Sequence, residues 1–200
     1  TLNYNTVEGG VVNLTAGYRR RFDSGLDGRK SLFMNPGIRY GFADKHLNPS
    51  VTVGYNFGKK YIHSLSFSGG RKVYQFNNAG AIPEGINTLG TLGYKLNYMK
   101  IYEADYFNAG YGAGIGNGLS WDAAFQFQNR MPLENLADPV NWRNPKNREF
   151  TPNYPADLTK LPMVPNRASM LTVGITWLPG ADYIEFPDRK VNLGSDYPTI

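Results

Sequence analysis

Hydrophobic and polar residues alternate with period two along several long stretches of the chain. In one of them Leu119, Trp121, Ala123, Phe125 and Phe127 alternate with residues that are mainly polar or small. Successive side chains of a β-strand point to opposite faces, so this pattern predicts a strand with one apolar face and one polar face. The stretches run to about ten residues or more, the length of a transmembrane β-strand rather than the five or six typical of soluble sheets.

Turn residues separate the alternating stretches, and Gly116-Asn117-Gly118 is the strongest hairpin signal among them. We therefore predict strands near residues 11–22, 32–43, 50–57, 61–70, 106–115, 119–130 and 168–178. Pro36 lies inside the second of these and lacks the amide hydrogen that a strand interior uses. A bulge or a strand end is expected there.

Two longer connections interrupt the strands. After Pro83 and Glu84, which suit a first helical turn, apolar residues recur at helical spacing, and this predicts an amphipathic helix near residues 83–103. Residues 131–166 form a second connection that is polar and rich in proline. The tighter turns follow the first, third and fifth predicted strands, so both long connections lie at the other end of the sheet.

The fold class predicted is all-β: an antiparallel, up-and-down transmembrane β-barrel in which residues 1–200 supply about seven or eight strands. An open sheet would expose unpaired backbone groups to hydrocarbon, at several kcal/mol each. We therefore expect a segment of a larger barrel, and the start at Thr1 without an initiator methionine suits a mature product or a fragment. Since bacterial barrels have short periplasmic turns and longer outer loops, the helix and residues 131–166 are expected to face the exterior.

Composition excludes several classes of function. The mean hydropathy of −0.43 and the lack of a long apolar run argue against transmembrane helices, whereas a barrel dilutes hydropathy because alternate residues face a polar lumen. The chain has no cysteine, which excludes thiol catalysis and disulfides and suits an oxidising cell envelope. Its net charge of +5 comes from scattered basic residues. This distribution does not predict nucleic-acid binding; lipid phosphates or an anionic solute are better counterparts.

No catalytic, cofactor-binding or metal-binding residue is predicted, and no cofactor. The glycine-rich run 110–118 is followed by a strand, whereas a phosphate-binding loop leads into a helix. His46 and His63 have no ligand partner at a metal-binding spacing. Glu103 and Asp105 are more often a local cap or salt bridge than an acid/base pair.

Arginines on the polar faces are the best candidates for function. Arg19, Arg21, Arg39 and Arg130 would point into the lumen of a barrel, where charged side chains set selectivity or bind anionic groups. The equally weighted alternative is a salt-bridged interior that plugs the barrel.

The proline-rich connection carries aromatic residues that could anchor a partner. Trp142, Phe150 and Tyr154 stand among polar residues in a loop expected outside the cell. Outer-membrane lipid and lipopolysaccharide are the predicted partners, together with other envelope proteins.

Five short motifs occur in a specific order along the chain: YNTVEG at Tyr4–Gly9, NYMKIYE at Asn97–Glu103, NRMPLEN at Asn129–Asn135, FTPNYP at Phe150–Pro155 and GSDYPT at Gly194–Thr199. Together they resemble a Bacteroidota family of uncharacterised outer-membrane proteins. Members of that family place a carboxypeptidase-regulatory-like β-sandwich ahead of a large β-barrel. The resemblance implies the outer membrane and a barrel fold, but it brings no catalytic residues; the sandwich and later strands are missing from these residues.

The expected function is that of a non-enzymatic, integral outer-membrane β-barrel protein serving transport, docking or envelope organisation. The alternative is a barrel that assembles or translocates other proteins, similar to the outer-membrane assembly and two-partner secretion superfamily. An outer-membrane lipase or protease would need a nucleophile, a base and an orienting group, and neither histidine has a persuasive partner.

Overall fold

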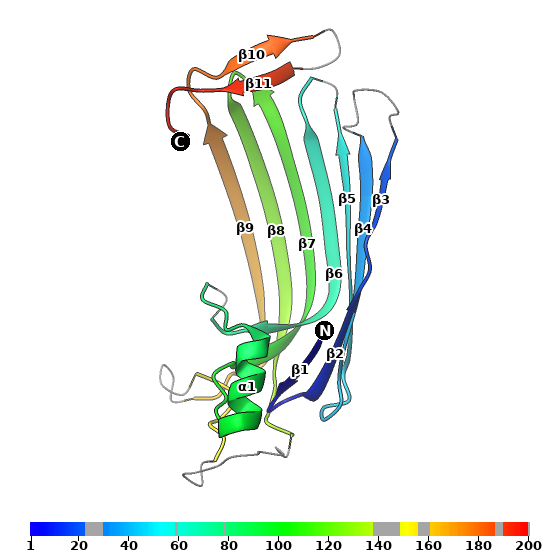
Figure 1. Ribbon diagram of the computed structural model, residues 1–200, viewed down its shortest axis with the longest axis vertical. Coiled ribbons are helices and arrows are strands. Elements are labelled where there is room, and N and C mark those ends of the chain that lie inside the picture. The colour runs from blue at the N-terminus through cyan, green and yellow to red at the C-terminus, as the bar shows by residue number, and fades with distance from the viewer. Residues whose placement is uncertain are drawn as a thin grey trace.

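The computed structural model describes residues 1–22, 30–58, 60–77, 79–137, 149–155, 161–186 and 190–199. Within these residues the protein is mainly β: an open antiparallel meander of nine strands, one short helix and a separate hairpin (Figure 1). The sheet strands are β1 (Leu2–Asn5), β2 (Gly9–Thr15), β3 (Tyr18–Arg21), β4 (Ser31–Gly41), β5 (Leu47–Phe57), β6 (His63–Gln75), β7 (Ile101–Gly116), β8 (Leu119–Pro132) and β9 (Asn166–Trp177). The hairpin consists of β10 (Asp182–Glu185) and β11 (Lys190–Gly194).

Each alternating stretch lies within the meander, and the register keeps its two faces separate from strand to strand. Val53 pairs with Phe67, Phe67 with Ala109, and Ala109 with Phe125, so one face is apolar across four strands. We call this the apolar face, and the opposite side of the same strands the polar face. Serines, asparagines and glutamines dominate the polar face over the same strands.

The predicted strand 11–22 is divided into β2 and β3. The register on either side of the gap, Thr15 with Gly37 and Tyr18 with Met34, places Ala16 opposite Pro36. Ala16 donates its N–H to the Pro36 carbonyl at 3.0 Å, but proline has no N–H to return. The strand end expected at Pro36 therefore falls on the neighbouring chain segment, while β4 runs through the proline.

β6 leaves β5 at a glycine. The pairing of β5 with β6 ends at Gly70, and residues beyond it pair only with β7. Gly70 has φ of +132°, and a Cβ there would lie 2.2 Å from the carbonyl oxygen of Pro49. Glycine is therefore required at this bend, where the lower part of β6 turns away from its neighbour (Figure 1).

Helix α1 (Glu84–Tyr94) is shorter than the predicted helix 83–103. Lys95 adopts a left-handed conformation with φ of 57° and ends the helix, and Ile101–Glu103 belong to β7. The apolar spacing of Leu96, Met99 and Tyr102 therefore misled the prediction. No helix in the described part of the chain is both long and apolar enough to cross a membrane.

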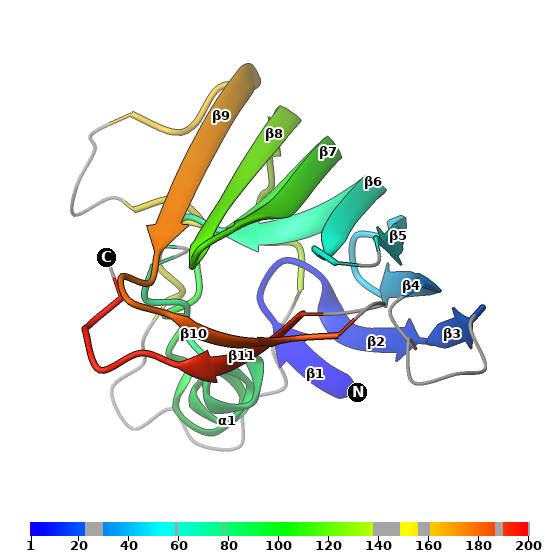
Figure 2. The ribbon, with the colours of Figure 1, turned by 90° about the horizontal axis from the view of Figure 1, so that it is seen from above.

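The two edges of the sheet differ. At the β1 edge, the hydroxyl of Thr88 on α1 accepts a hydrogen bond from the N–H of Tyr4 at 2.9 Å. Its single hydrogen has two acceptors within reach, the Glu84 carbonyl at 2.8 Å and the Tyr4 carbonyl at 3.2 Å. β9 ends the strand order at the other edge and pairs only with β8 among the described strands. Figure 2 shows the sheet as an open arc with α1 and the β10–β11 hairpin on its open side.

Strands β1, β10 and β11 were not predicted. β1 has four residues and lacks a clear alternation, and the hairpin is held by contacts distant in sequence. Tyr183 of β10 accepts a hydrogen bond from the N–H of Gly118 at 2.6 Å, and Glu185 forms an ion pair with Lys60.

The buried apolar cluster is small and lies at the helix end. It consists of Val7, Met99 and Ile101, with Val73 and Leu133 packed against it. Many large apolar side chains of the long strands are instead exposed, among them Phe67, Phe107, Phe125 and Leu171.

Candidate functional site

A buried ion network joins three elements at the helix end of the sheet. Arg39 on β4 donates through Nη2 and Nε to the Glu8 carboxylate at 2.6 and 2.7 Å, and through Nη1 to Glu84 of α1 at 2.6 Å. The Glu8 side chain is 0% exposed, and that of Arg39 13%. Removing a charge from water is costly, so this geometry is stable only because both partners are present. The network fixes the β1–β2 turn and α1 to the polar face of the sheet.

The β1–β2 turn is itself buried, which is unusual for a connection. Asn5 Oδ1 accepts the N–H groups of Val7 and Glu8 at 3.0 and 2.8 Å, and so closes the turn. The Thr6 carbonyl accepts the N–H groups of Leu136 and Ala137, at the start of the proline-rich connection. The turn thus links both long connections to the sheet.

A second polar cluster lies near the first. Nδ1 of His46 is 2.9 Å from Oε2 of Glu103, and Arg71 pairs with Asp105 at 2.7 Å. Asp44, in the turn between β4 and β5, accepts a hydrogen bond from the His46 N–H through Oδ1. Its buried Oδ2 has no hydrogen-bond donor among the described residues but lies 3.9 Å from Nδ1 of His46. Burial raises the pKa of Asp44, and the nearby Glu8 carboxylate adds to this rise.

The four candidate arginines do not form one ring. Arg39 is committed to its two carboxylates, and Arg130 donates to Gln128 at 2.7 Å with its guanidinium 5.5 Å from the ring centre of Tyr102. Arg19 lies 5.8 Å from the ring centre of Phe33, toward the opposite end of the sheet, and Arg21 is exposed there on β3.

Two of the three aromatic candidates lie in the described part of the proline-rich connection. Phe150 has the Lys95 ammonium 5.5 Å from its ring centre, and Tyr154 lines a groove of about 730 Å³. Trp142 lies outside the described residues.

Sequence reasoning missed the asparagines that hold the connections in place. Asn153 donates through Nδ2 to the Ile101 and Leu133 carbonyls at 2.7 and 2.8 Å and accepts the Ile101 N–H at 3.0 Å. Asn97 donates to Thr6 at 2.7 Å. Asn97 lies in the motif NYMKIYE and Asn153 in FTPNYP, and membership of these motifs is the sequence signal that marks both residues.

Among the described residues, no three His, Cys, Asp or Glu side chains gather as a metal ion would require. His63 contacts the Tyr111 hydroxyl at 2.7 Å. The ion pairs join chain segments that lie far apart in sequence.

Comparison with protein families matches residues 1–200 to the C-terminal domain of DUF5686, a family of unknown function. The chain belongs to the DUF5686 family. The expected membership of an uncharacterised family is thus confirmed. No curated protein and no solved structure matches the DUF5686 domain described here.

Proposed function

We propose that this DUF5686 domain forms part of the wall of an integral outer-membrane β-barrel that is not an enzyme and serves transport, docking or envelope organisation. The observation that carries the proposal is the distribution of apolar side chains. On β9, Leu171, Val173 and Ile175 are 70%, 62% and 71% exposed, and on the inner strands Phe67, Phe107 and Phe125 are 45%, 45% and 41% exposed.

A soluble sheet would bury such a face. Soluble monomers rarely expose apolar patches larger than a few hundred Å². Here β4 to β9 carry apolar residues outward over strands of 11 to 16 residues, while the buried cluster at the helix end is small. Lipid is the environment that makes this arrangement favourable, because each strand is long enough to span the hydrocarbon core.

The free edge of β9 supports a larger barrel. Unpaired backbone groups cost several kcal/mol each in hydrocarbon, so a further strand should pair with β9. Consecutive antiparallel pairings make β9 run in the same direction as β2 and β3 at the other side of the arc. An all-antiparallel closure therefore needs an odd number of further strands, which gives the even total usual for bacterial barrels.

The edges of a second copy would not close this barrel. In a copy with the same membrane orientation, β9, β2 and β3 all run parallel to the free β9, and the oppositely directed β1 is covered by α1. Strands from outside residues 1–200 are required, in line with the proposed Bacteroidota outer-membrane family and its larger barrel.

The interior contacts favour a plugged barrel over an open arginine-lined pore. Arg39 is neutralised by Glu8 and Glu84, and the β1–β2 turn and α1 are held against the polar face. A docking or organising role fits an interior of this kind better than free diffusion of a solute. The buried turn also faces the end that carries both long connections.

The second candidate function is assembly or translocation of other outer-membrane proteins. The observation in its favour is the β9 edge, which offers twelve residues of strand to an incoming partner. Photo-crosslinking from β9 in cells distinguishes the two functions. A constant partner strand supports a closed wall, whereas several client proteins support assembly.

The membrane proposal is tested by refolding these residues from urea together with the strands that complete the proposed barrel, with and without liposomes. The bilayer and micelle experiments below use the same full-length protein. We expect sheet formation, measured by far-ultraviolet circular dichroism and by heat-modifiable gel mobility, to require the bilayer or a detergent micelle. A monodisperse folded monomer in plain buffer would overturn the proposal.

A further inference from the structure

A groove at the helix end has the size and lining of a ligand site. Its volume of about 730 Å³ lies within the range of about 300 to 1,000 Å³ found for small-molecule sites. The end of β6, the segment after α1 and the segment 149–155 enclose it. Three aromatic rings, those of Phe76, Tyr98 and Tyr154, lie on its surface together with Pro152 and Pro155.

One buried acceptor in the groove lining has no partner. Asn97 is only 7% exposed, and its Nδ2 is used by Thr6, but its Oδ1 has no hydrogen-bond donor among the described residues. This oxygen is itself covered by protein atoms, so the groove offers a ligand its rings and charged side chains rather than this acceptor.

Backbone groups around the groove are already paired. The N–H of Phe76 donates to the carbonyl of Lys100 at 3.1 Å, and the Gln75 side chain bonds both the N–H and the carbonyl of Ile82 at 2.8 Å. An extended peptide that binds by strand addition needs a free edge. The groove instead offers ring faces and side-chain groups.

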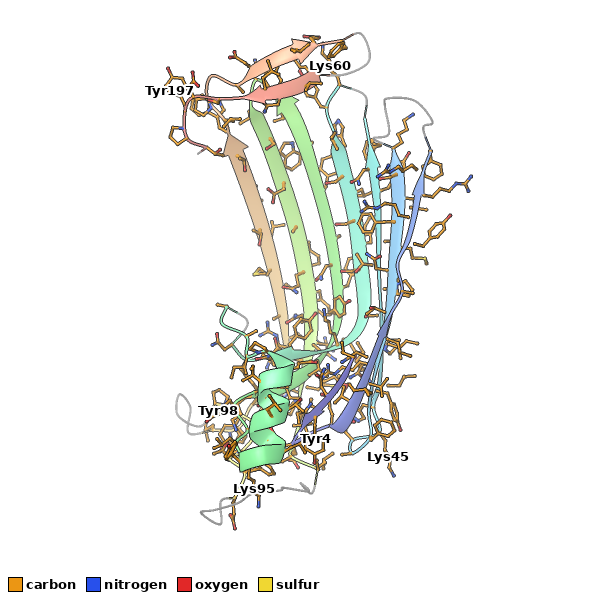
Figure 3. All side chains as sticks on the ribbon, in the orientation of Figure 1. Tyr4, Lys45, Lys60, Lys95, Tyr98 and Tyr197 are labelled. Carbon is orange, nitrogen blue, oxygen red and sulfur yellow. The ribbon has the colours of Figure 1, made fainter. Side chains whose placement is uncertain are left out.

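The described lining of the groove carries more positive than negative charge. Among the described residues, Lys95 and Lys100 line the groove with one carboxylate, Glu149, and the Lys100 ammonium also donates to Thr151. Figure 3 shows Lys95 and Tyr98 together at the helix end of the molecule, and Tyr98 is 56% exposed. Ring faces and ammonium groups match a sugar that carries an anionic substituent.

We infer that this groove binds an acidic oligosaccharide, with pyranose rings stacked on Tyr98 and Tyr154 and acidic groups placed beside Lys95 and Lys100. The inference deepens the proposed function, on which it rests for placing the groove outside the cell, where lipopolysaccharide sugars and free acidic polysaccharides are both found.

Calorimetric titration of the full chain in detergent micelles tests it, with hexagalacturonate as the probe. Tyr98→Ala and Tyr154→Ala should each weaken binding about tenfold, whereas Tyr98→Phe, which keeps the ring, should stay near wild type. Lys95→Gln should weaken binding and reduce its salt dependence. Tyr197→Ala is the matched control, since this exposed tyrosine lies at the opposite end of the molecule (Figure 3).

Several results would overturn the inference. These are no hexagalacturonate binding, equal binding by both alanine variants and wild type, or equal affinity for neutral maltohexaose. Binding of decaproline with the same loss in both alanine variants would assign the groove to a peptide instead. Bilayer insertion is measured separately. If the protein inserts but does not bind the sugar, the result contradicts the groove inference and leaves the proposed membrane function intact. A titration with bacterial lipopolysaccharide then distinguishes lipopolysaccharide sugars from free acidic polysaccharides as the ligand.

Discussion

Substituting arginine on the two faces of one strand should give opposite results. Phe125 and Gln126 are neighbours on β8, and their partners on β7 are Ala109 and Asn108. Phe125 lies on the apolar face and Gln126 on the polar face. If lipid covers the apolar face, Phe125→Arg places a charge in hydrocarbon, whereas Gln126→Arg places it in the hydrated interior.

The magnitude follows from the exposure of Phe125. Its side chain is 41% exposed, so loss of the ring removes about 80 Å² from lipid contact, or about 2 kcal/mol at about 25 cal/mol per Å². An arginine near the bilayer midplane adds about 2 to 4 kcal/mol. Phe125→Arg should therefore reduce the free energy of unfolding by about 4 to 6 kcal/mol, whereas Gln126→Arg should cost less than about 1 kcal/mol.

Urea titration in liposomes, followed by tryptophan fluorescence, measures both variants in the same bilayer. Phe125→Ala separates the loss of the ring from the cost of the charge. Equal effects of the two arginine variants, or a Phe125→Arg effect below about 1 kcal/mol, would refute a lipid-facing apolar surface.

Four further predictions concern the helix end. Arg39→Met should reduce the free energy of unfolding by about 3 to 5 kcal/mol in urea titration, because it leaves Glu8 buried and unpaired; adding Glu8→Gln should recover part of this loss. The pKa of Asp44 is raised in the folded protein, so its stabilising contribution is fully present below the unfolded-state pKa of about 3.9 and is lost as the pH rises through the folded-state pKa. Asp44→Asn should therefore flatten the acid side of a plot of unfolding free energy against pH. An unchanged plot would contradict this. Thr88→Val should speed hydrogen exchange at the Tyr4 amide and cost about 1 kcal/mol, and unchanged exchange would argue against α1 as an edge cap. Protease added to intact cells should cut within residues 131–166, whereas cleavage only after the outer membrane is broken would reverse the topology.

The presence of the long strands could be predicted because a sheet with one apolar and one polar face requires apolar and polar residues to alternate along each strand. The alternation around Phe125 requires no knowledge of any distant residue. The end of the helix was harder to predict from sequence. Apolar residues at helical spacing continue past Tyr94, although Lys95 adopts a left-handed backbone conformation and ends the helix. Apolar residues beyond that point serve β7 and the buried cluster instead.

The polar network could not be predicted from local sequence. Arg39 was chosen for its place on a polar face, but its partners Glu8 and Glu84 are far from it in the chain. Only the fold brings the β1–β2 turn and α1 to the same strand. Asn97 and Asn153 were visible as motif residues, yet their carbonyl and hydroxyl partners come from other elements.

Spin-label accessibility along β8 tests the membrane-facing surface most directly. The chain has no cysteine, so single-cysteine variants from Leu119 to Pro132 can each carry one nitroxide in liposomes. Positions on the face of Phe125 should collide readily with dissolved oxygen, which concentrates in lipid, and poorly with a water-soluble nickel chelate. Positions on the face of Gln126 should lack this preference, so that the oxygen-to-nickel ratio alternates with period two. A flat profile, or nickel access on the face of Phe125, would contradict a β-sheet that faces lipid.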